Sequence, residues 1–302
     1  MSLDATTTET IRRHLEQVRL RVEEELERRL PAADAYPPSI HRAMRYSVFA
    51  GGKRLRPILC FESGRLFGGE EQELLRLGSA LELIHTYSLI HDDLPALDND
   101  DLRRGKPTSH RAFGEATAIL AGDAPLTLSF EVLSSPGLLG EPLQLRVIHE
   151  LAHAIGTRGG MVGGQVVDLE TTDQTSNSGT LEYIHAAKTG SFIRAAVRCG
   201  ALYAQAAEDD LARVSTYGEK VGLAFQIVDD LLDILGTPQE LGKSVGKDGH
   251  QHKATFPALH GVEESRRIAA RLAQEACEVL EPYGIRARTL QGIAQYLITR
   301  NR

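Results

Sequence analysis

The sequence predicts an all-α protein, and three observations support this fold class. Apolar residues recur at spacings of three and four over several long stretches, which is the period of an amphipathic helix. Alternating strand patterns with Asn-Gly turns are missing from the sequence. Aromatic residues make up only 5% of the chain and Trp is absent, which suits helices rich in Ala, Leu, Glu and Arg better than a β-sandwich.

The first helix is expected at residues 11–30, where Arg and Glu separate the apolar positions until Pro31 ends the pattern. Its apolar residues are Ile11, Leu15, Val18, Val22, Leu26 and Leu30. Further helical stripes are expected at about 71–92, 142–155, 181–205, 208–234 and 264–282. Loops are expected where Gly, Pro and polar residues gather, at 35–38, 99–108, 171–180 and 236–253.

Length and composition indicate one globular domain. The chain has 302 residues, 42% of them hydrophobic, which is enough to form a core of its own. Its 28 Gly and 12 Pro are scattered, and no Ser-rich or Pro-rich linker divides the sequence. We therefore expect a single domain over residues 1–302.

Charge and hydropathy exclude several classes of protein. The formal net charge of −7 disfavours nucleic acid as a partner, because neutralising phosphates needs an extended cationic surface. The longest stretch free of Asp, Glu, Lys and Arg is 289–299, well short of the roughly 18 residues that span a bilayer. The first residues lack the basic and apolar regions of a signal peptide, so we expect a cytoplasmic protein without stable membrane association. The three widely spaced Cys are expected to be buried free thiols.

The first candidate site is an acidic run at residues 92–101, directly after an apolar helical stretch. On an unbroken helix Asp98 would lie about 240° around the axis from Asp92, so the two carboxylates could not share an ion. Pro95 removes a backbone donor and disfavours helix at Leu94. The chain can therefore leave the helix and fold Asp98 back beside Asp92.

The second candidate site is an acidic run at residues 229–233, within another apolar stretch. Gln226, Asp229 and Asp233 share one helical face, and like charges one turn apart destabilise a helix unless cations neutralise them. Either run alone could be a solvated helix end. Two runs together indicate a site with only oxygen ligands, which favours Mg²⁺ over zinc or copper. Calcium is less favoured, because the sequence has no EF-hand loop.

Two basic segments lie near the acidic runs in an otherwise acidic protein. Residues 51–57 are Gly-Gly-Lys-Arg-Leu-Arg-Pro, and residues 102–106 are Leu-Arg-Arg-Gly-Lys. Arg and Lys side chains bind phosphate oxygens, and the double Gly permits close approach of the backbone. The alternative is that they neutralise acidic neighbours on the surface. Lys188, Lys243 and Lys253 are each a weak indication of phosphate binding on their own. Together with the two basic segments, they indicate a cavity for more than one diphosphate.

These motifs resemble those of the trans-isoprenyl diphosphate synthase family over nearly the whole chain. Residues 51–57 are similar to the family's homoallylic-diphosphate motif, Asp92–Asp98 to its first aspartate-rich motif, and Asp229–Asp233 to its second. Residues 164–169, and 246–248 followed by 253–257, are similar to further family segments. The resemblance implies an isoprenoid synthase-type helical bundle around a deep central cavity, and a homodimer.

The resemblance also implies a role for each site residue. Asp92 and Asp98 would bind two Mg²⁺ ions and Asp229 a third, with Mn²⁺ as a substitute, while Asp93 and Asp233 would orient ligands or metal-bound waters. The residues implied to hold the allylic diphosphate are Arg103, Lys188, Lys243 and Lys253. Those implied to hold isopentenyl diphosphate are Gly52, Lys53, Arg56, His85 and Arg104. The predicted position of His85 is consistent with this role, because on a helix its side chain lies about 20° around the axis from that of Asp92.

The implied activity is Mg²⁺-dependent condensation of dimethylallyl or geranyl diphosphate with isopentenyl diphosphate, with Thr189 and Gln226 facing the allylic cation. In the family an aromatic residue five positions before the first Asp accompanies short products, so Tyr87, beside Ser88, indicates the C15 product farnesyl diphosphate. Tyr87 could instead be purely structural. Whether Arg300 and Arg302 help to close the site is left open.

The sequence has features of several other functions. Geranylgeranyl and geranyl diphosphate synthases differ from a farnesyl diphosphate synthase only in product length. A class I terpene cyclase needs no second diphosphate pocket, and a noncatalytic subunit has little reason to retain both acidic motifs. Residues 149–153, His-Glu-Leu-Ala-His, fit a zinc-protease pattern, but Gly159 occupies the position of the third ligand, so we expect a coincidence.

Overall fold

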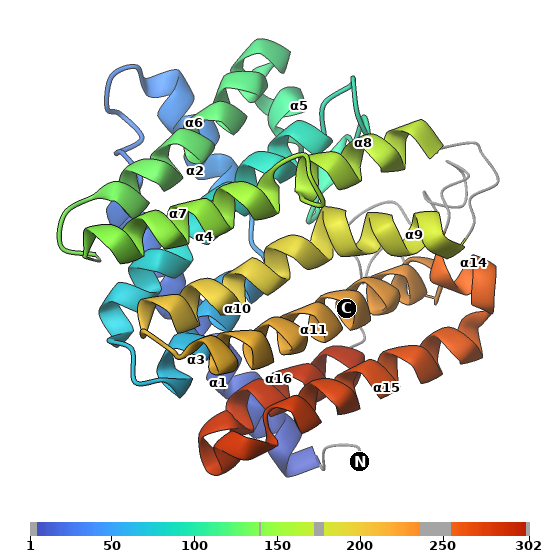
Figure 1. The fold of residues 1–302 in the computed structure, drawn as a ribbon. Helices are drawn as coiled ribbons and strands as arrows, with labels where there is room; N and C mark the ends of the chain where they lie inside the picture. The colour runs from blue at the N-terminus through green and yellow to red at the C-terminus, as the bar shows by residue number, and fades with distance from the viewer. Residues whose placement is uncertain (1–4, 139, 172–177, 236–254, 300–302) are drawn as a thin grey trace.

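The fold is taken from a computed structural model that describes residues 5–138, 140–171, 178–235 and 255–299. Within these ranges the chain forms a bundle of helices with one hairpin of two-residue strands, which confirms the all-α prediction (Figure 1). The first elements are α1 (Ala5–Arg29), α2 (Pro38–Val48), α3 (Leu55–Leu66), α4 (Glu71–Asp92), β1 (Leu102–Arg103), β2 (Lys106–Pro107), α5 (Ser109–Phe113), α6 (Glu115–Ser134) and α7 (Glu141–Ile155). The later ones are α8 (Met161–Thr171), α9 (Ser178–Ile184), π-helix η1 (His185–Gly190), α10 (Ser191–Tyr203), α11 (Glu208–Leu235), α14 (Phe256–His260), α15 (Val262–Val279), the 3₁₀-helix η2 (Glu281–Ala287) and α16 (Arg288–Thr299).

The long amphipathic stretches were predicted closely. The stripes at 71–92, 142–155 and 208–234 correspond to α4, α7 and α11. The stripe at 181–205 is interrupted, because π-helix η1 separates α9 from α10. Helices such as α3 were not predicted, because they are buried on most sides and no single apolar stripe marks them. The hairpin of β1 and β2 lies in the predicted loop 99–108, and the predicted loop 236–253 falls outside the described residues.

The core is built around α4 and α10, which both pack against α3. Leu77, Leu81 and Ile84 of α4 and Phe192 of α10 are fully buried in one hydrophobic cluster. Each such side chain stabilises the fold by about 1.5–3 kcal/mol relative to exposure. Because α4 is held on several sides, its last residue, Asp92, has a fixed position.

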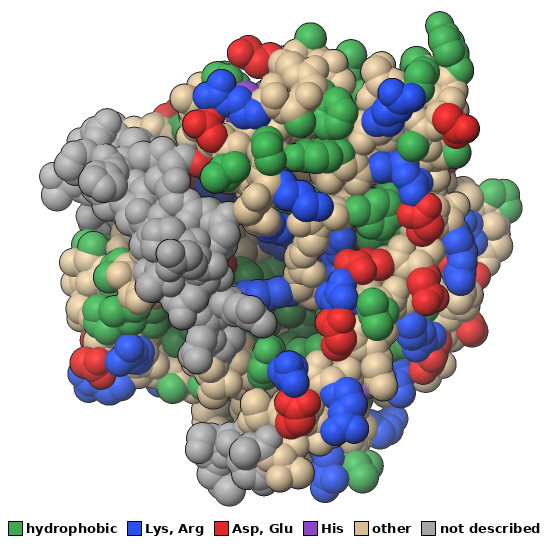
Figure 2. Space-filling model, turned by 180° about the vertical axis from the view of Figure 1, so that it is seen from behind, with side chains coloured by type: hydrophobic (Ala, Val, Ile, Leu, Met, Phe, Trp, Pro, Cys, Tyr) green, Lys and Arg blue, Asp and Glu red, His purple; other side chains and the backbone are tan. Residues whose placement is uncertain are grey.

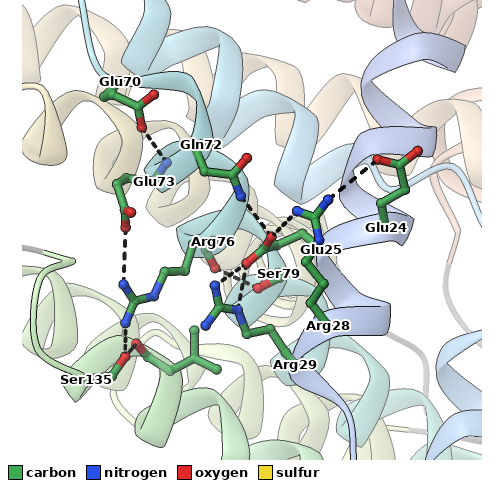
Figure 3. Close-up of polar contacts among 11 residues, drawn as sticks. Glu24, Glu25, Arg28, Arg29, Glu70, Gln72, Glu73, Arg76, Ser79 and Ser135 are labelled. Carbon is green, nitrogen blue, oxygen red and sulfur yellow. Dashed lines mark hydrogen bonds and ion pairs between the residues drawn. The ribbon is translucent and has the colours of Figure 1, made fainter.

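A polar network joins the end of α1 to the start of α4 (Figure 3). Glu25 is fully buried and accepts hydrogen bonds from Arg28 Nη1 at 3.0 Å, Arg29 Nε at 2.6 Å and Gln72 Nε2 at 2.9 Å. A buried charge of this kind is stable only when donors satisfy it. The network therefore fixes the contact between the two helices.

One described helix, α6, is long and apolar enough to cross a membrane by length and composition, with a mean hydropathy of 1.3 over its window. This is weak support for a membrane span, because core helices of globular proteins pass the same test. Helix α6 packs against α2, α4 and α5. Its outer face leaves Ile119 and Leu120 exposed.

Candidate active site

A cavity of about 540 Å³ lies between α3, α4, α8, η1 and α11, beside the β1–β2 hairpin. Its wall combines carboxylates, cations and apolar side chains. The predicted site residues on this wall are Arg56, His85, Tyr87, Ser88, Asp92, Arg103, Arg104, Lys188, Thr189, Gln226 and Asp229. In Figure 2, Lys and Arg side chains gather around a hollow near the centre of the face shown.

A second cavity, of about 820 Å³, lies between α1, α15 and α16. Its lining consists mainly of Thr, Gln and Ala, with one cation, Arg288, and no carboxylate among the residues that the structure assigns to it. Polar groups that converge on one point are a better guide to a site than volume alone. The smaller cavity is therefore the candidate active site.

The chain reverses its direction directly after α4. The backbone amide of Asp98 donates to the carbonyl oxygen of Asp92 at 2.8 Å, and the amide of Asp100 donates to that of Asp93 at 3.2 Å. This confirms that the chain folds Asp98 back beside Asp92. Burial, opposed by Lys188 and reinforced by Asp98, raises the pKa of Asp92 to about 6. A buried carboxylate beside another one is stabilised by a bound cation.

Asp93 holds a cation at the cavity wall. It is buried, and Arg103 donates to its Oδ1 from Nη2 at 2.6 Å and from Nε at 2.8 Å. Burial raises the pKa of Asp93, and the hydrogen bond from Arg103 opposes that rise. Asp93 does not line the cavity, so its direct partner is the arginine.

The second acidic run contributes one carboxylate to the cavity wall. Asp229 lines the cavity, whereas Asp233 is buried and is not among the lining residues, so its part in orienting a ligand stays a prediction. Asp230, which was not predicted, is also buried and accepts a hydrogen bond from Gln226 Nε2 at 3.0 Å. Gln226 Oε1 in turn accepts from Thr189 Oγ1 at 3.0 Å.

Positive charge gathers on another part of the wall. Burial lowers the pKa of Arg56 to about 10, which leaves it charged at neutral pH. Burial, together with Arg56 and Arg104, lowers the pKa of His85 well below its usual value, so its imidazole is neutral. Among the described residues, neither His85 Nδ1 nor Arg56 Nε has a hydrogen-bond partner. An anionic ligand bound here would neutralise the arginines and could satisfy these atoms.

The double glycine makes room for one of these cations. Arg104 Nη1 donates to the carbonyl oxygen of Gly51. A Cβ atom on Gly52 would lie 2.7 Å from the Arg104 guanidinium, and the φ angle of Gly52 is +128°. Only glycine fits this position without displacing Arg104.

Some predicted site residues lie elsewhere. Lys53 is exposed and is not among the lining residues, so its contact with a substrate stays a prediction. The adjacent Arg54 is buried and donates to Glu82 at 2.8 Å, which joins α3 to α4. Lys243, Lys253, Arg300 and Arg302 lie outside the described residues.

The π-helix η1 presents Lys188 and Thr189 to the cavity. A π turn inserts one extra residue into a helix and is frequent at functional sites. Lys188 Nζ donates to Asp168 Oδ2 of α8 at 2.7 Å. Gly164 lets α8 approach closely, because a Cβ atom there would lie 2.3 Å from the Lys188 backbone nitrogen.

Tyr87 and His91 both line the cavity. Their rings meet edge to face, with centroids 5.8 Å apart and an interplanar angle of 83°. His91 Nε2 lies 3.0 Å from the carbonyl oxygen of Ile119 on α6. A Cβ atom on Gly122 would lie 2.1 Å from that nitrogen, so α6 packs directly against the histidine. His91 was not predicted as part of this wall.

Gln165 is another wall residue that was not assigned a role. Its Nε2 is buried and has no hydrogen-bond partner in the part of the chain that the structure describes. The resemblance of residues 164–169 to a family segment was the only indication in the sequence. The same segment supplies Asp168, the partner of Lys188.

The zinc-protease pattern does not form a metal site. His149 and His153 are exposed, and Glu150 accepts from Arg198 at 2.6 Å. Across the described ranges, no three His, Cys, Asp or Glu side chains are placed to bind a metal by themselves. The donors at the cavity, Asp92 and Asp229, suit Mg²⁺, which commonly takes one or two carboxylates and completes its shell with water and substrate phosphates.

The chain is similar to known proteins over most of its length. Residues 37–281 match the family described as polyprenyl synthetase. A geranylgeranyl diphosphate synthase from Cyanophora paradoxa is 47% identical over 93% of this chain and 93% of its own length. The apo crystal structure of an FPP/GFPP synthase from Zymomonas mobilis superposes with a TM-score of 0.86, at 38% identity over 96% of this chain and 99% of that one.

A geranyltransferase from Helicobacter pylori, whose crystal structure is complexed with magnesium and isoprenyl diphosphate, superposes with a TM-score of 0.84. It is 31% identical over 99% of this chain and 98% of its own. The family match covers most of the sequence, and these similarities extend over nearly all of it. The chain therefore belongs to the polyprenyl synthetase family.

Proposed function

We propose that this chain is a Mg²⁺-dependent prenyltransferase that joins dimethylallyl or geranyl diphosphate to isopentenyl diphosphate and yields farnesyl diphosphate. One observation carries the proposal. A single cavity bears the carboxylates Asp92 and Asp229 from two helices and, separately, the partly buried cations Arg56 and Arg104. Chain elongation needs sites for two diphosphates, whereas terpene cyclisation needs only one.

The carboxylate side would bind the allylic substrate. Asp92, Asp98 and Asp229 would hold Mg²⁺, with three ions as the proposed number, and Mg²⁺ when bound supplies positive charge to the departing diphosphate. Arg103 and Lys188 add fixed cations, which Asp93 and Asp168 hold in position. Charge on the diphosphate grows as the C–O bond breaks, so these fixed cations stabilise the transition state more than the substrate.

The rest of the wall would handle the carbon chain and the second substrate. Thr189 and Gln226 would face the allylic cation with their oxygens, and apolar residues of α8 such as Val162 would keep water from it. Arg56 and Arg104 would hold isopentenyl diphosphate so that its double bond attacks the cation. A carbon–carbon bond then forms, and the released diphosphate takes the proton whose loss leaves a trans alkene.

Product length is the finer part of the proposal. Tyr87, backed by His91 and α6, lies on the wall near Asp92 where a growing tail would extend, which favours C15. Ser88 lines the same region and is small. The similarity to a geranylgeranyl diphosphate synthase supports C20 as the second candidate.

The experiment that tests the function is incubation of the purified protein with isopentenyl diphosphate, Mg²⁺ and either dimethylallyl or geranyl diphosphate. Chromatography of the dephosphorylated products should give farnesol. Geranylgeraniol would establish the second candidate. A cyclic hydrocarbon from one allylic substrate alone would support a cyclase, and no product from any mixture would support a noncatalytic subunit.

We also propose that the chain forms a homodimer. The outer face of α6 supports this, because Ile119 and Leu120 are 46% and 58% exposed on a helix that is otherwise strongly apolar. Exposed apolar surface of this kind often marks a contact with another chain. Light scattering should give about twice the mass of 33.0 kDa calculated for the chain.

A further inference from the structure

One buried carboxylate, Asp230, has no part in the proposed function. It follows Asp229 on α11 and is 4% exposed. Its Oδ1 accepts a hydrogen bond from Gln226 Nε2 at 3.0 Å. Its Oδ2 accepts one from the backbone N–H of Phe256, the first residue of α14, also at 3.0 Å. Asp230 therefore connects a cavity residue to the backbone of another helix.

Packing fixes the Phe256 side of this arrangement. The ring of Phe256 stacks on the ring of His185, with centroids 5.2 Å apart and planes 23° from parallel. His185 begins η1, the π-helix that carries Thr189. Asp230, Phe256 and His185 are all buried, so the carboxylate cannot turn without moving α14 or η1.

The acceptor character of Asp230 decides which end of the Gln226 amide faces the cavity. The Oδ1 atom of Asp230 accepts the hydrogen bond from Gln226 Nε2, so the amide directs its NH₂ group toward Asp230. The carbonyl oxygen of Gln226 then faces Thr189, whose hydroxyl donates to it. Because Thr189 has used its only hydrogen, the oxygen lone pairs of both side chains are available to the cavity.

We propose that Asp230 is a positioning residue that fixes the polarity of the Gln226 and Thr189 dipoles, so that oxygen rather than N–H faces the developing allylic cation. This inference rests on the proposed function, in which these two side chains face that cation. Dipoles oriented in advance toward a developing charge lower the barrier without reorganising during the reaction. If the amide were reversed, its N–H groups would oppose the cation.

The test is Asp230→Asn, which keeps the shape of the side chain and exchanges one acceptor for a donor. The N–H of Phe256 donates to Oδ2, and His185 Nε2 lies 3.5 Å from the same atom, so we expect an oxygen to stay at that position. The new NH₂ group would then face Gln226 and turn its amide over. We expect kcat to fall on the order of 100-fold. The KM values of both diphosphates should stay within about threefold, because no group that binds them is removed.

A second substitution provides the rescue. Adding Gln226→Glu to Asp230→Asn places an acceptor opposite the new NH₂ group and returns an oxygen to Thr189, with no change in net charge. We expect the double variant to recover at least about tenfold in kcat over Asp230→Asn. The matched control is Glu278→Gln, which alters a similar pair on α15, where Gln274 Nε2 donates to Glu278 Oε1 at 3.0 Å in an exposed position.

Nuclear magnetic resonance of protein labelled with ¹⁵N-glutamine observes the amide directly. The side-chain NH₂ resonance of Gln226, identified by its loss in Gln226→Glu, should move upfield in Asp230→Asn and stay in place in Glu278→Gln. An unmoved resonance, an unchanged kcat in Asp230→Asn, or a loss that the double variant does not recover would each overturn the inference. A wild-type protein that makes no prenyl product would instead overturn the proposed function, while the resonance still decides the orientation of the amide.

Discussion

The backbone amide of Asp98 donates to the carbonyl oxygen of Asp92, and this hydrogen bond folds the acidic run back at the end of α4. Asp98 is thereby brought close enough for its charge to act on the carboxyl group of Asp92, and both residues are partly buried. Burial raises the pKa of Asp92 to about 6, with Asp98 adding to the rise. In the absence of a bound cation, this geometry therefore disfavours the ionised form of Asp92.

The raised pKa of Asp92 should make the stability of the metal-free protein depend on pH. The folded pKa lies above the unfolded value of about 4, so the contribution of Asp92 is full at low pH and is lost as the pH rises through 6. Between pH 7 and pH 4, the free energy of unfolding of the wild type should rise by about 2 kcal/mol relative to Asp92→Asn. Urea denaturation in the presence of a chelator measures this difference.

The comparison with Asp92→Asn is needed because another group acts in the opposite direction. Burial lowers the pKa of His185 to about 4. The folded protein therefore loses the stability contributed by neutral His185 as the pH falls below the pKa of this residue in the unfolded chain. Both proteins share that effect, and it cancels in the difference. Saturating Mg²⁺ should reduce the difference, because the cation favours ionised Asp92. Parallel pH profiles for the two chelated proteins would contradict the assignment.

Removing either cavity carboxylate should abolish most of the turnover. Asp92→Ala and Asp229→Ala each remove a proposed metal ligand, and we expect kcat to fall by roughly 10³-fold or more with the fold intact. Steady-state kinetics and circular dichroism measure the two quantities. Asp209→Ala is the matched control, since Asp209 is exposed in the first turn of the same helix as Asp229. Near-normal turnover in either cavity variant would remove that residue from the metal site.

Gly52→Ala should weaken the binding of isopentenyl diphosphate selectively. The new methyl group would lie 2.7 Å from the present position of the Arg104 guanidinium and displace it. We expect the KM for isopentenyl diphosphate to rise about tenfold, as for the loss of one charge-assisted hydrogen bond, and the KM for the allylic substrate to change much less. Gly68→Ala controls for backbone strain, because Gly68 has a φ of +82° and a Cβ atom there would contact nothing within 4 Å. An equal rise in both KM values would contradict the assignment of Arg104 to one substrate.

The sequence predicted those parts of the site that depend on local geometry. The reversal at Pro95 and the use of one helix for Gln226 and Asp229 follow from backbone rules over a few residues. The buried Asp230 could not be assigned from the sequence, because its partner Phe256 lies on another helix. The difference between Lys53, which is exposed, and Arg56, which lines the cavity, depends in the same way on tertiary packing.

The network around Glu25 should contribute to stability and not to catalysis (Figure 3). Glu25→Ala leaves three donors without their acceptor, and we expect a loss of about 2 kcal/mol in the free energy of unfolding. This is below the usual value for a buried pair, because Arg28 and Arg29 are partly exposed and can be rehydrated. Glu24→Ala is the control, with an expected loss below about 0.5 kcal/mol, since that carboxylate is exposed and 4.0 Å from Arg28. Equal losses for the two variants, or a changed kcat, would contradict this assignment.

Tyr87→Ala should lengthen the product. Tyr87 and His91 close the wall against α6, and removing the phenol ring opens space where the tail of the C15 product would end. We therefore expect products of C20 and longer, identified by chromatography after dephosphorylation, with little change in the rate of the first condensation. Tyr87→Phe is the matched control, because it keeps the ring, the edge contact with His91 and the position of the wall, and should retain the wild-type product. If Tyr87→Ala still releases only the wild-type product, Tyr87 does not set the chain length, and its role is to hold His91 between α4 and α6.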